Sequence, residues 1–295
     1  MEQSDLLANY NKNDLILLDT VNFTDEYPTL LIKSIMTKND VLAKVLIKYE
    51  IRLNIRRKCD NMNAFLLAVQ QGNLYIAKKI YKKCGNIEDI GINNHTALSL
   101  ACRYGHAPLV DFLISKNANV NHCTKNNYTP LILAASYGHL EIVKKLIANG
   151  ACVKMTDNFD SNALIYASKE GYDKMVDYLV NETDIDIYHR DNNFCNALMY
   201  AKEFNRAFKC SKNCYKTIIR ILLEKDSKNG NGNSSAQNNN DTFLDKIVYS
   251  IQDFMVSCNI VVNNNPENPD SNPEQTNNNR DRANRNYENF FDVMY

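Results

Sequence analysis

NNYTPLILAASYGHLEIVKKLIANGACV, which runs from Asn126 to Val153, is the stretch that decides the fold. Nearly the same sequence, NNHTALSLACRYGHAPLVDFLISKNANV, precedes it by 33 residues, and FDSNALIYASKEGYDKMVDYLVNETDI follows it by the same step. Equivalents of Pro130 fall at Ala64, Ala97, Ala163 and Ala197, and equivalents of Gly138 at Gly72, Gly105, Gly171 and Asn205. Self-similarity at a period of about 33 residues predicts a stack of repeated units, so the repeat is interpreted before any single residue.

Each copy reads as two short helices. The first would carry Leu131, Leu133, Ala134 and Ala135 on one stripe, with small residues where a neighbour must approach closely. Gly138 is placed to end it, because glycine adopts positive φ readily at a helix end. A second helix follows, with Ile142, Val143, Leu146 and Ile147 at helical spacing, and Gly150 ends it. Two helices this short cannot bury their apolar faces alone, whereas stacked copies can.

The segment TPLILAASYGHLEIVKKLIANGA resembles the ankyrin repeat, whose pattern is T-P-L-H-x-A, then Gly-His, then an apolar second helix. The resemblance covers residues 60 to about 226. It implies an all-α solenoid of helix-turn-helix units joined by β-hairpin-like loops, which forms a curved scaffold for protein binding. It also implies a structural role near the helix turn for His106 and His139, which occupy the Gly-His position.

The chain departs from the family pattern at two positions. The glycine of the turn is replaced by Asn61, Asn94, Asn127, Asp160 and, in the last copy, Phe194. Asn and Asp tolerate a left-handed backbone, but Phe does not, so we expect the last hairpin to be distorted. The histidine of T-P-L-H is replaced by Ser99, Ile132 and Ile165, so its hydrogen bonds must be lost or replaced.

The repeat pattern extends beyond its clearest copies. Thr29 to Ile32 aligns with Thr129 to Ile132, which makes residues 26–58 a degenerate first repeat with Lys38 at the glycine position. In the last repeat the insertion RAFKCSKNC, residues 206–214, should project from one rim of the stack. The expected organisation is an N-terminal helical cap at 1–25, an array at 26–226 (repeats at about 26–58, 59–91, 92–124, 125–157, 158–191 and 192–226), a flexible linker at 227–240, an amphipathic helix at 241–262 and an Asn-rich disordered tail at 263–295.

The amphipathic helix has two interpretations. Its apolar residues, Phe243, Ile247, Ile251, Phe254 and Cys258, recur every three to four positions. Such a helix either caps the last repeat or docks in a partner's groove.

The composition limits the classes of partner and the cellular compartment that we expect. The 295 residues include 34 basic and 34 acidic side chains, so the total charge gives no argument for nucleic acid or an anionic membrane, and neither is expected. No signal-like or membrane-spanning run is evident, so we expect a monomeric cytoplasmic protein, with the nucleus as an alternative. The nine cysteines are then reduced thiols.

Catalytic and metal-binding patterns are weak. Cys210 and Cys214 form a single Cys-x3-Cys pair, whereas structural zinc sites usually show two pairs. The chain carries no Gly-x-Ser-x-Gly, phosphate loop or His-Glu-x-x-His motif. We therefore expect no cofactor, no metal and no enzyme activity.

The resemblance implies that inner-helix ends and hairpin tips face the concave side. One register precedes each break glycine and holds Gln71, Tyr104, Tyr137, Glu170 and Phe204, with Arg103, Ser136, Lys169 and Glu203 beside it. The hairpin tips add Tyr128 and Phe159, and also Met62, His95 and Ser161. Aromatic and arginine side chains are the usual energetic anchors of interfaces, so this ladder is the candidate protein-binding site. The alternative is that Tyr104 and Tyr137 pack on each other between repeats.

Two functions follow from this interpretation. The first is a non-enzymatic protein-binding scaffold that uses the concave face. The second is an adaptor that recruits a bound target to other machinery, such as a ubiquitin ligase, through the C-terminal helix or tail.

Overall fold

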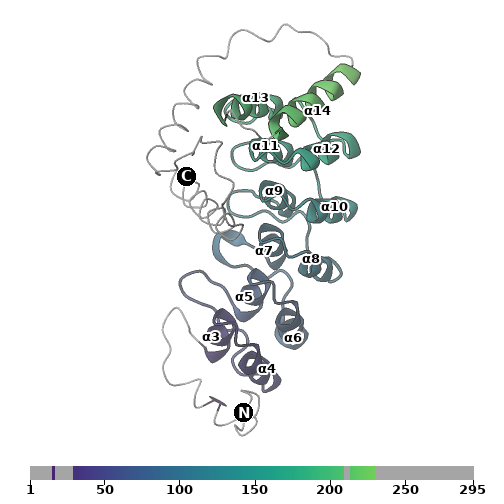
Figure 1. Ribbon diagram of the computed structural model, residues 1–295. Coiled ribbons are helices and arrows are strands. Elements are labelled where there is room, and N and C mark those ends of the chain that lie inside the picture. Colours follow the sequence, from purple (N-terminus) through teal and green to yellow (C-terminus); the bar gives the residue numbers. More distant parts are fainter. Residues whose placement is uncertain (1–14, 17–28, 209–212, 230–295) are drawn as a thin grey trace, which may run out of the picture. The chain divides into compact units, whose positions relative to one another are not determined.

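A computed structural model describes residues 15–16, 29–208 and 213–229, and within them all regular secondary structure is helical (Figure 1). Most of the expected N-terminal cap and all of the amphipathic helix and the tail lie outside the described residues. The inner helices are α3 (Leu30–Met36), α5 (Ala64–Gln70), α7 (Ala97–Arg103), α9 (Pro130–Ser136), α11 (Ala163–Lys169) and α13 (Ala197–Phe208). The outer helices are α4 (Asp40–Lys48), α6 (Leu74–Cys84), α8 (Ala107–Ile114), α10 (Leu140–Ala148), α12 (Asp173–Glu182) and α14 (Cys214–Lys228).

The described helices form two columns (Figure 1). Each inner helix contacts the next inner helix along the chain, from α3 to α13, and outer helices pack likewise, as α4 on α6 and α12 on α14. The loops that connect successive pairs contain the 3-10 helix η1 (Ile92–Asn94) and two isolated antiparallel bridges, Arg56 with Asn63 and Ile90 with Thr96. The expected all-α solenoid is confirmed.

The inner helices begin at side-chain caps and are buried almost throughout. Thr29, Asn63, Thr96, Thr129 and Asn162 each accept a hydrogen bond from the backbone N–H three residues further on. Such a cap satisfies one of the donors that a helix start leaves unpaired. Alanines fill the most crowded positions, and Ala68, Ala101, Ala134 and Ala167 are all 0% exposed. These small side chains let successive inner helices approach closely.

The hairpin turns use a left-handed backbone at the expected position. Asn61, Asn94, Asn127 and Asp160 have φ between 56° and 63°. Phe194 has the same conformation, with φ 58°, and its turn is not distorted. Asp191 N–H donates to the Cys195 carbonyl at 3.1 Å, as Asp157 N–H does to the Ser161 carbonyl one repeat earlier. The expectation of a distorted last hairpin was wrong, because these backbone bonds hold the turn against the preference of the side chain.

Each break glycine lies under a ring from the following pair. Gly72, Gly105, Gly138 and Gly171 have φ of 75° to 77°, and Lys38 has φ 55° at the equivalent point. A Cβ on Gly72 would come within 2.6 Å of the His106 ring, and one on Gly105 within 2.5 Å of His139. Tyr172 and Tyr215 cover Gly138 and Gly171.

The same rings tie neighbouring pairs together by hydrogen bonds. His106 Nε2 donates to the Gln70 carbonyl at 2.9 Å, and His139 Nε2 to the Arg103 carbonyl at 3.2 Å. Tyr215 Oη donates to the Lys169 carbonyl at 2.8 Å. The implied structural role of His106 and His139 is therefore what the geometry shows.

The last pair differs from the others at its first helix. Asn205, the equivalent of the break glycine, lies inside α13, which continues to Phe208 instead of ending before it. The first residues of the insertion thus lengthen the inner helix, while residues 209–212 lie outside the described part. The absence of glycine does not by itself explain this, because Lys38 takes positive φ at the equivalent position and α3 ends before it.

Candidate protein-binding site

The candidate site lies where the inner helices end. Gln71, Tyr104, Tyr137 and Glu170 are the residues that cap the C-termini of α5, α7, α9 and α11, so they hold equivalent positions on successive pairs. We call this row, with Gln70 and Arg103 beside it, the inner-helix rim. Phe204 does not join it, since it lies within α13.

Arg103 links the two tyrosines of the rim. Its guanidinium carbon lies 5.9 Å from the ring centre of Tyr104 and 5.5 Å from that of Tyr137, which is cation–π geometry. Tyr104 is 40% exposed, and its hydroxyl accepts a hydrogen bond from Gln70 Nε2 at 3.0 Å. Its ring also stacks on His106, with the ring centres 6.3 Å apart. The rim therefore presents an arginine and two tyrosines in fixed positions.

Lys169 belongs to a buried polar network rather than to an open surface. Its ammonium lies 3.5 Å from Asp191 Oδ2 and 4.1 Å from the ring centre of Tyr200, and its side chain is only 21% exposed. Burial lowers the pKa of Lys169, although the charge of Asp191 opposes that shift. Lys169 is thus held by its neighbours across the repeat boundary.

Two buried aspartates organise this network, and the sequence interpretation missed them. Tyr166 Oη donates to Asp157 Oδ2 and Tyr200 Oη to Asp191 Oδ2, both at 2.6 Å. Burial raises the pKa of Asp157, and the hydrogen bonds from Tyr166 and from two turn N–H groups oppose it. The hydroxyl of Tyr128 lies 3.2 Å from that of Tyr166, so this predicted binding residue is part of the network. The sequence does contain a signal of this network, because Asp157 recurs as Asp191 and Tyr166 as Tyr200, each 34 residues later.

Three residues expected at hairpin tips are buried. Met62, His95 and Ser161 are 2%, 6% and 1% exposed, so their placement at the surface was wrong. The residue with positive φ forms the tip, and the one after it turns into the core. Phe194 is an exposed aromatic of the last hairpin, 71% exposed, and was not predicted as a binding residue. Phe159 is half-buried.

His95 forms a hydrogen bond with Ser99 inside the core. Its Nδ1 lies 3.0 Å from the hydroxyl of Ser99, the residue that replaces the family histidine. Burial lowers the pKa of His95 to about 4, and the charges of Arg103 and His122 add to the effect. The imidazole is therefore neutral at physiological pH.

The remaining predicted residues divide between surface and core. Glu170 is exposed and Ser136 is half-buried, with its hydroxyl donating to the Leu133 carbonyl at 3.0 Å. Glu203 is only 6% exposed. Phe204 stacks on Tyr215, with ring centres 6.0 Å apart, so it packs within the last pair.

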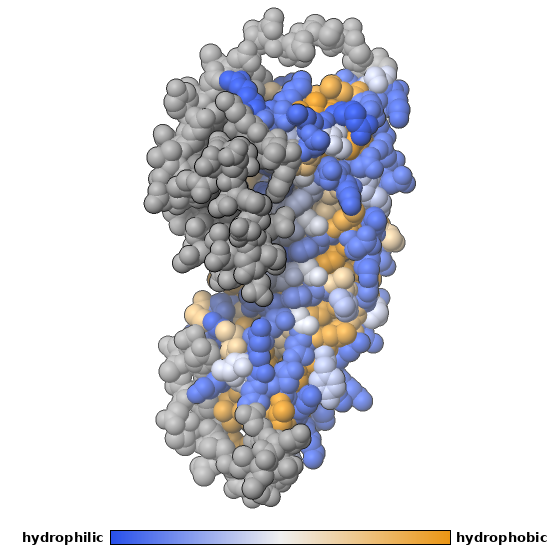
Figure 2. Space-filling view, viewed as in Figure 1, coloured by the Kyte–Doolittle hydropathy of each residue, from blue (hydrophilic) through white to orange (hydrophobic). Residues whose placement is uncertain are grey.

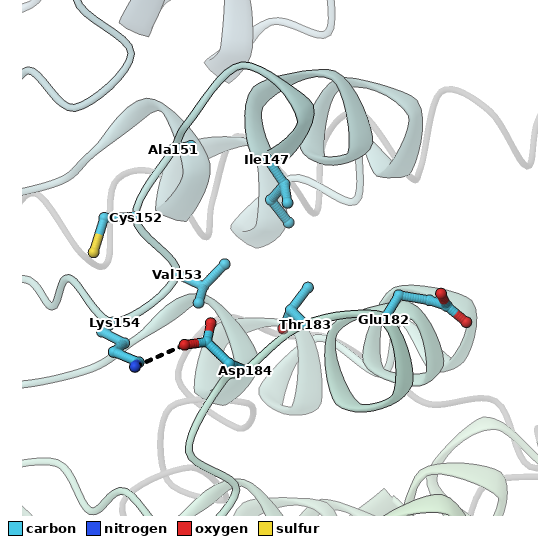
Figure 3. A pocket seen from close by; sticks show the side chains of 8 residues that line it. All are labelled: Ile147, Ala151, Cys152, Val153, Lys154, Glu182, Thr183 and Asp184. Carbon is cyan, nitrogen blue, oxygen red and sulfur yellow. Dashed lines mark ion pairs between the residues drawn. The ribbon is translucent and has the colours of Figure 1, made fainter.

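A shallow pocket of about 420 Å³ lies away from the rim, between the C-terminal end of α10 and the segment after α12 (Figure 3). Its lining residues are Ile147, Ala151, Cys152, Val153, Lys154, Glu182, Thr183 and Asp184. Lys154 Nζ and Asp184 Oδ2 form an ion pair at 2.7 Å, but the two side chains are 64% and 72% exposed. An ion pair this accessible to water contributes little, and the pocket offers no shielded charge for catalysis.

The described residues form neither a candidate metal site nor a candidate membrane span. In this part of the chain no group of three or more His, Cys, Asp or Glu side chains is arranged to hold a metal ion. Cys210, half of the weak zinc pair, lies outside it. None of the described helices is long and apolar enough to cross a membrane.

The stacked helix pairs define a helical-repeat solenoid whose units contact their nearest neighbours. Residues 65–157 match the family model for ankyrin repeats (3 copies). Residues 65–157 of the chain are therefore ankyrin repeats. Among curated proteins, none matches this sequence.

Proposed function

We propose that the chain is a non-enzymatic scaffold that binds a protein partner through the inner-helix rim around Arg103, Tyr104 and Tyr137. Ankyrin repeats generally mediate contacts between proteins, which supports the general class of function. The rim supports the location, because Tyr and Arg supply most of the binding energy at protein interfaces.

The observation that carries the proposal is the fixed position of Arg103 between two tyrosines of consecutive pairs. The hydrogen bond from Gln70 and the stacking on His106 further restrict Tyr104. Side chains that are already ordered lose little conformational entropy when a partner binds, so more of their contact energy appears as affinity.

The test is affinity capture with the wild type and a Tyr104→Ala/Tyr137→Ala variant, with captured proteins quantified by mass spectrometry. Losing two interface anchors of about 2 kcal/mol each should reduce capture of a specific partner more than 100-fold. The matched control is Tyr178→Ala/Tyr188→Ala, which removes two tyrosines from the outer-helix side. Equal retention by the rim variant and the wild type, with unchanged thermal unfolding, would refute the rim as the binding site.

The adaptor function rests on segments that lie outside the described residues. It stays a prediction of the sequence, and no described contact favours it over simple scaffolding.

A further inference from the structure

The electrical balance of the chain hides a strongly uneven distribution. Residues 29–85 contain 12 Lys and Arg against 3 Asp and Glu, a net charge of +9 in a chain whose total is zero. The two helix pairs from α3 to α6 lie in this segment. A charge asymmetry of this size indicates an anionic partner, which the total charge could not reveal.

The structure gathers five of these charges on one outer surface. Lys44 and Lys48 are exposed on α4, and Lys78, Lys79 and Lys82 are exposed on α6, which packs against α4. We call these five residues the lysine face. Hydrophilic side chains cover much of this part of the surface (Figure 2).

Tyr75 joins the two helices at the centre of the lysine face. Its ring is 51% exposed, and the Lys44 and Lys79 ammonium groups lie 4.8 Å and 5.4 Å from the ring centre. Cation–π contacts with the same ring hold the two lysines near each other. A charge of α4 and a charge of α6 therefore lie close together at this ring.

The lysine face is not neutralised by the described part of the protein. Ion pairs engage Lys83 with Glu50, Lys144 with Glu141, and Lys145 with Asp111. None of the five lysines forms an ion pair with a carboxylate of the described residues. Like charges this close repel one another, and a polyanion would relieve that repulsion.

We propose that the lysine face binds the phosphate backbone of a nucleic acid. Protein interfaces are depleted in lysine, so a face built from lysines is unlike a protein-binding surface. Helices that lie on membranes add Trp, Phe or Leu side chains that insert among the lipids. The exposed aromatic of the lysine face is Tyr75, whose ring centre lies 4.8 Å and 5.4 Å from two ammonium groups. A cluster of exposed point charges of one sign suits a polymer of phosphates best.

The salt dependence of binding gives a quantitative expectation. Five lysines that each contact one phosphate of a duplex give a slope of about −4.5 for the logarithm of the association constant against that of the salt concentration. Between 50 mM and 200 mM salt, affinity should then fall about 500-fold.

The experiment measures binding of the full chain to a fluorescein-labelled 20-base-pair DNA duplex by fluorescence anisotropy at several KCl concentrations. Lys79→Gln/Lys82→Gln should reduce the magnitude of the slope by about 2, and replacing all five lysines by Gln should remove the salt-dependent binding. The matched control is Lys144→Gln/Lys145→Gln, which removes the same charge from α10, where both lysines are paired with acids.

Three outcomes would overturn the proposal. The slope of the wild type could be near zero, or the two double variants could lose affinity equally, which would show that binding follows total charge. A polyglutamate peptide or vesicles with phosphatidylserine could also bind the lysine face more tightly than the duplex, which would assign it to an acidic protein or a membrane. Unchanged circular dichroism melting of each variant excludes unfolding as the cause.

Discussion

Phe194 adopts a backbone conformation that its side chain disfavours, and the cost to the stability of the protein can be measured. A left-handed conformation costs an ordinary residue about 1–2 kcal/mol, whereas Asn tolerates it. Asn61, Asn94 and Asn127 adopt the same φ at the equivalent turns. Phe194→Asn should therefore relieve most of that strain, at the expense of the small part of the ring that is covered.

A second variant separates the effect of backbone strain from the effect of side-chain burial. Phe194→Ala loses the same partial burial but keeps the strain, so the Asn variant should be the more stable of the two by about 1 kcal/mol. For a chain of this size that difference corresponds to about 2–4 °C in Tm.

The assay is thermal unfolding by circular dichroism and urea unfolding under identical conditions. Asn127→Ala provides the reverse control, because it introduces the strain at a turn that lacks it and should destabilise by a similar amount. If Phe194→Ala proved as stable as Phe194→Asn, the backbone at this turn would not be strained and the argument would be refuted.

Two further predictions concern the core. Gly105→Ala should destabilise the protein by about 3 kcal/mol, because the added Cβ would meet the His139 ring at 2.5 Å and φ is 75°. Gly150→Ala is the control: φ is 86° but no atom lies within 4 Å, so it should cost about 1 kcal/mol. Equal urea midpoints for the two variants would contradict the steric role of the ring. Stability should also fall as the pH drops from about 6.5 to 4, since the unfolded chain protonates His95 while burial holds its folded pKa near 4. This effect reaches about 3 kcal/mol, and a pH series of urea unfolding should show a shallower decline for His95→Asn; identical declines would exclude His95 as the cause.

The backbone conformation of the turns in the stack could be predicted from the sequence. Asn61, Asn127 and Asp160 take the left-handed turn, and Lys38 takes the place of a break glycine, all as expected. These features are local, because they depend on which residue types accept positive φ. Phe194 shows the limit of that rule, since the hydrogen bonds of its turn outweigh its own preference.

Side-chain exposure was harder to predict, because it depends on the next repeat. Lys169 and Glu203 share the register of the rim, but contacts across the repeat boundary bury most of Lys169, and Glu203 is 6% exposed. Met62 and His95 follow the tip residue and turn inward, which a pattern of positions does not show. The rim around Arg103 and Tyr104 is the part of the predicted site that the structure brings together at the surface.

The charge distribution illustrates a different limit. A total charge of zero gives no argument for a nucleic-acid partner, but a sum over the whole chain also averages segments of opposite sign. Counting by repeat reveals the basic segment 29–85, and the fold then shows that Lys44 of α4 and Lys79 of α6 lie at the same ring.

The rings that cover the break glycines give the stack a direction. Each pair with a break glycine leaves a glycine surface that a ring of the following pair covers. Three of these rings also bond a carbonyl of the preceding pair, so this contact always runs from a pair to its C-terminal neighbour. His106 and Tyr215 make equivalent bonds to carbonyls that lie 36 and 46 residues earlier in the chain. The bond therefore depends on where the ring lies in the fold and not on a fixed number of intervening residues. Evolution could therefore insert sequence between the helices of a pair, or append a pair that carries such a ring, without altering what came before.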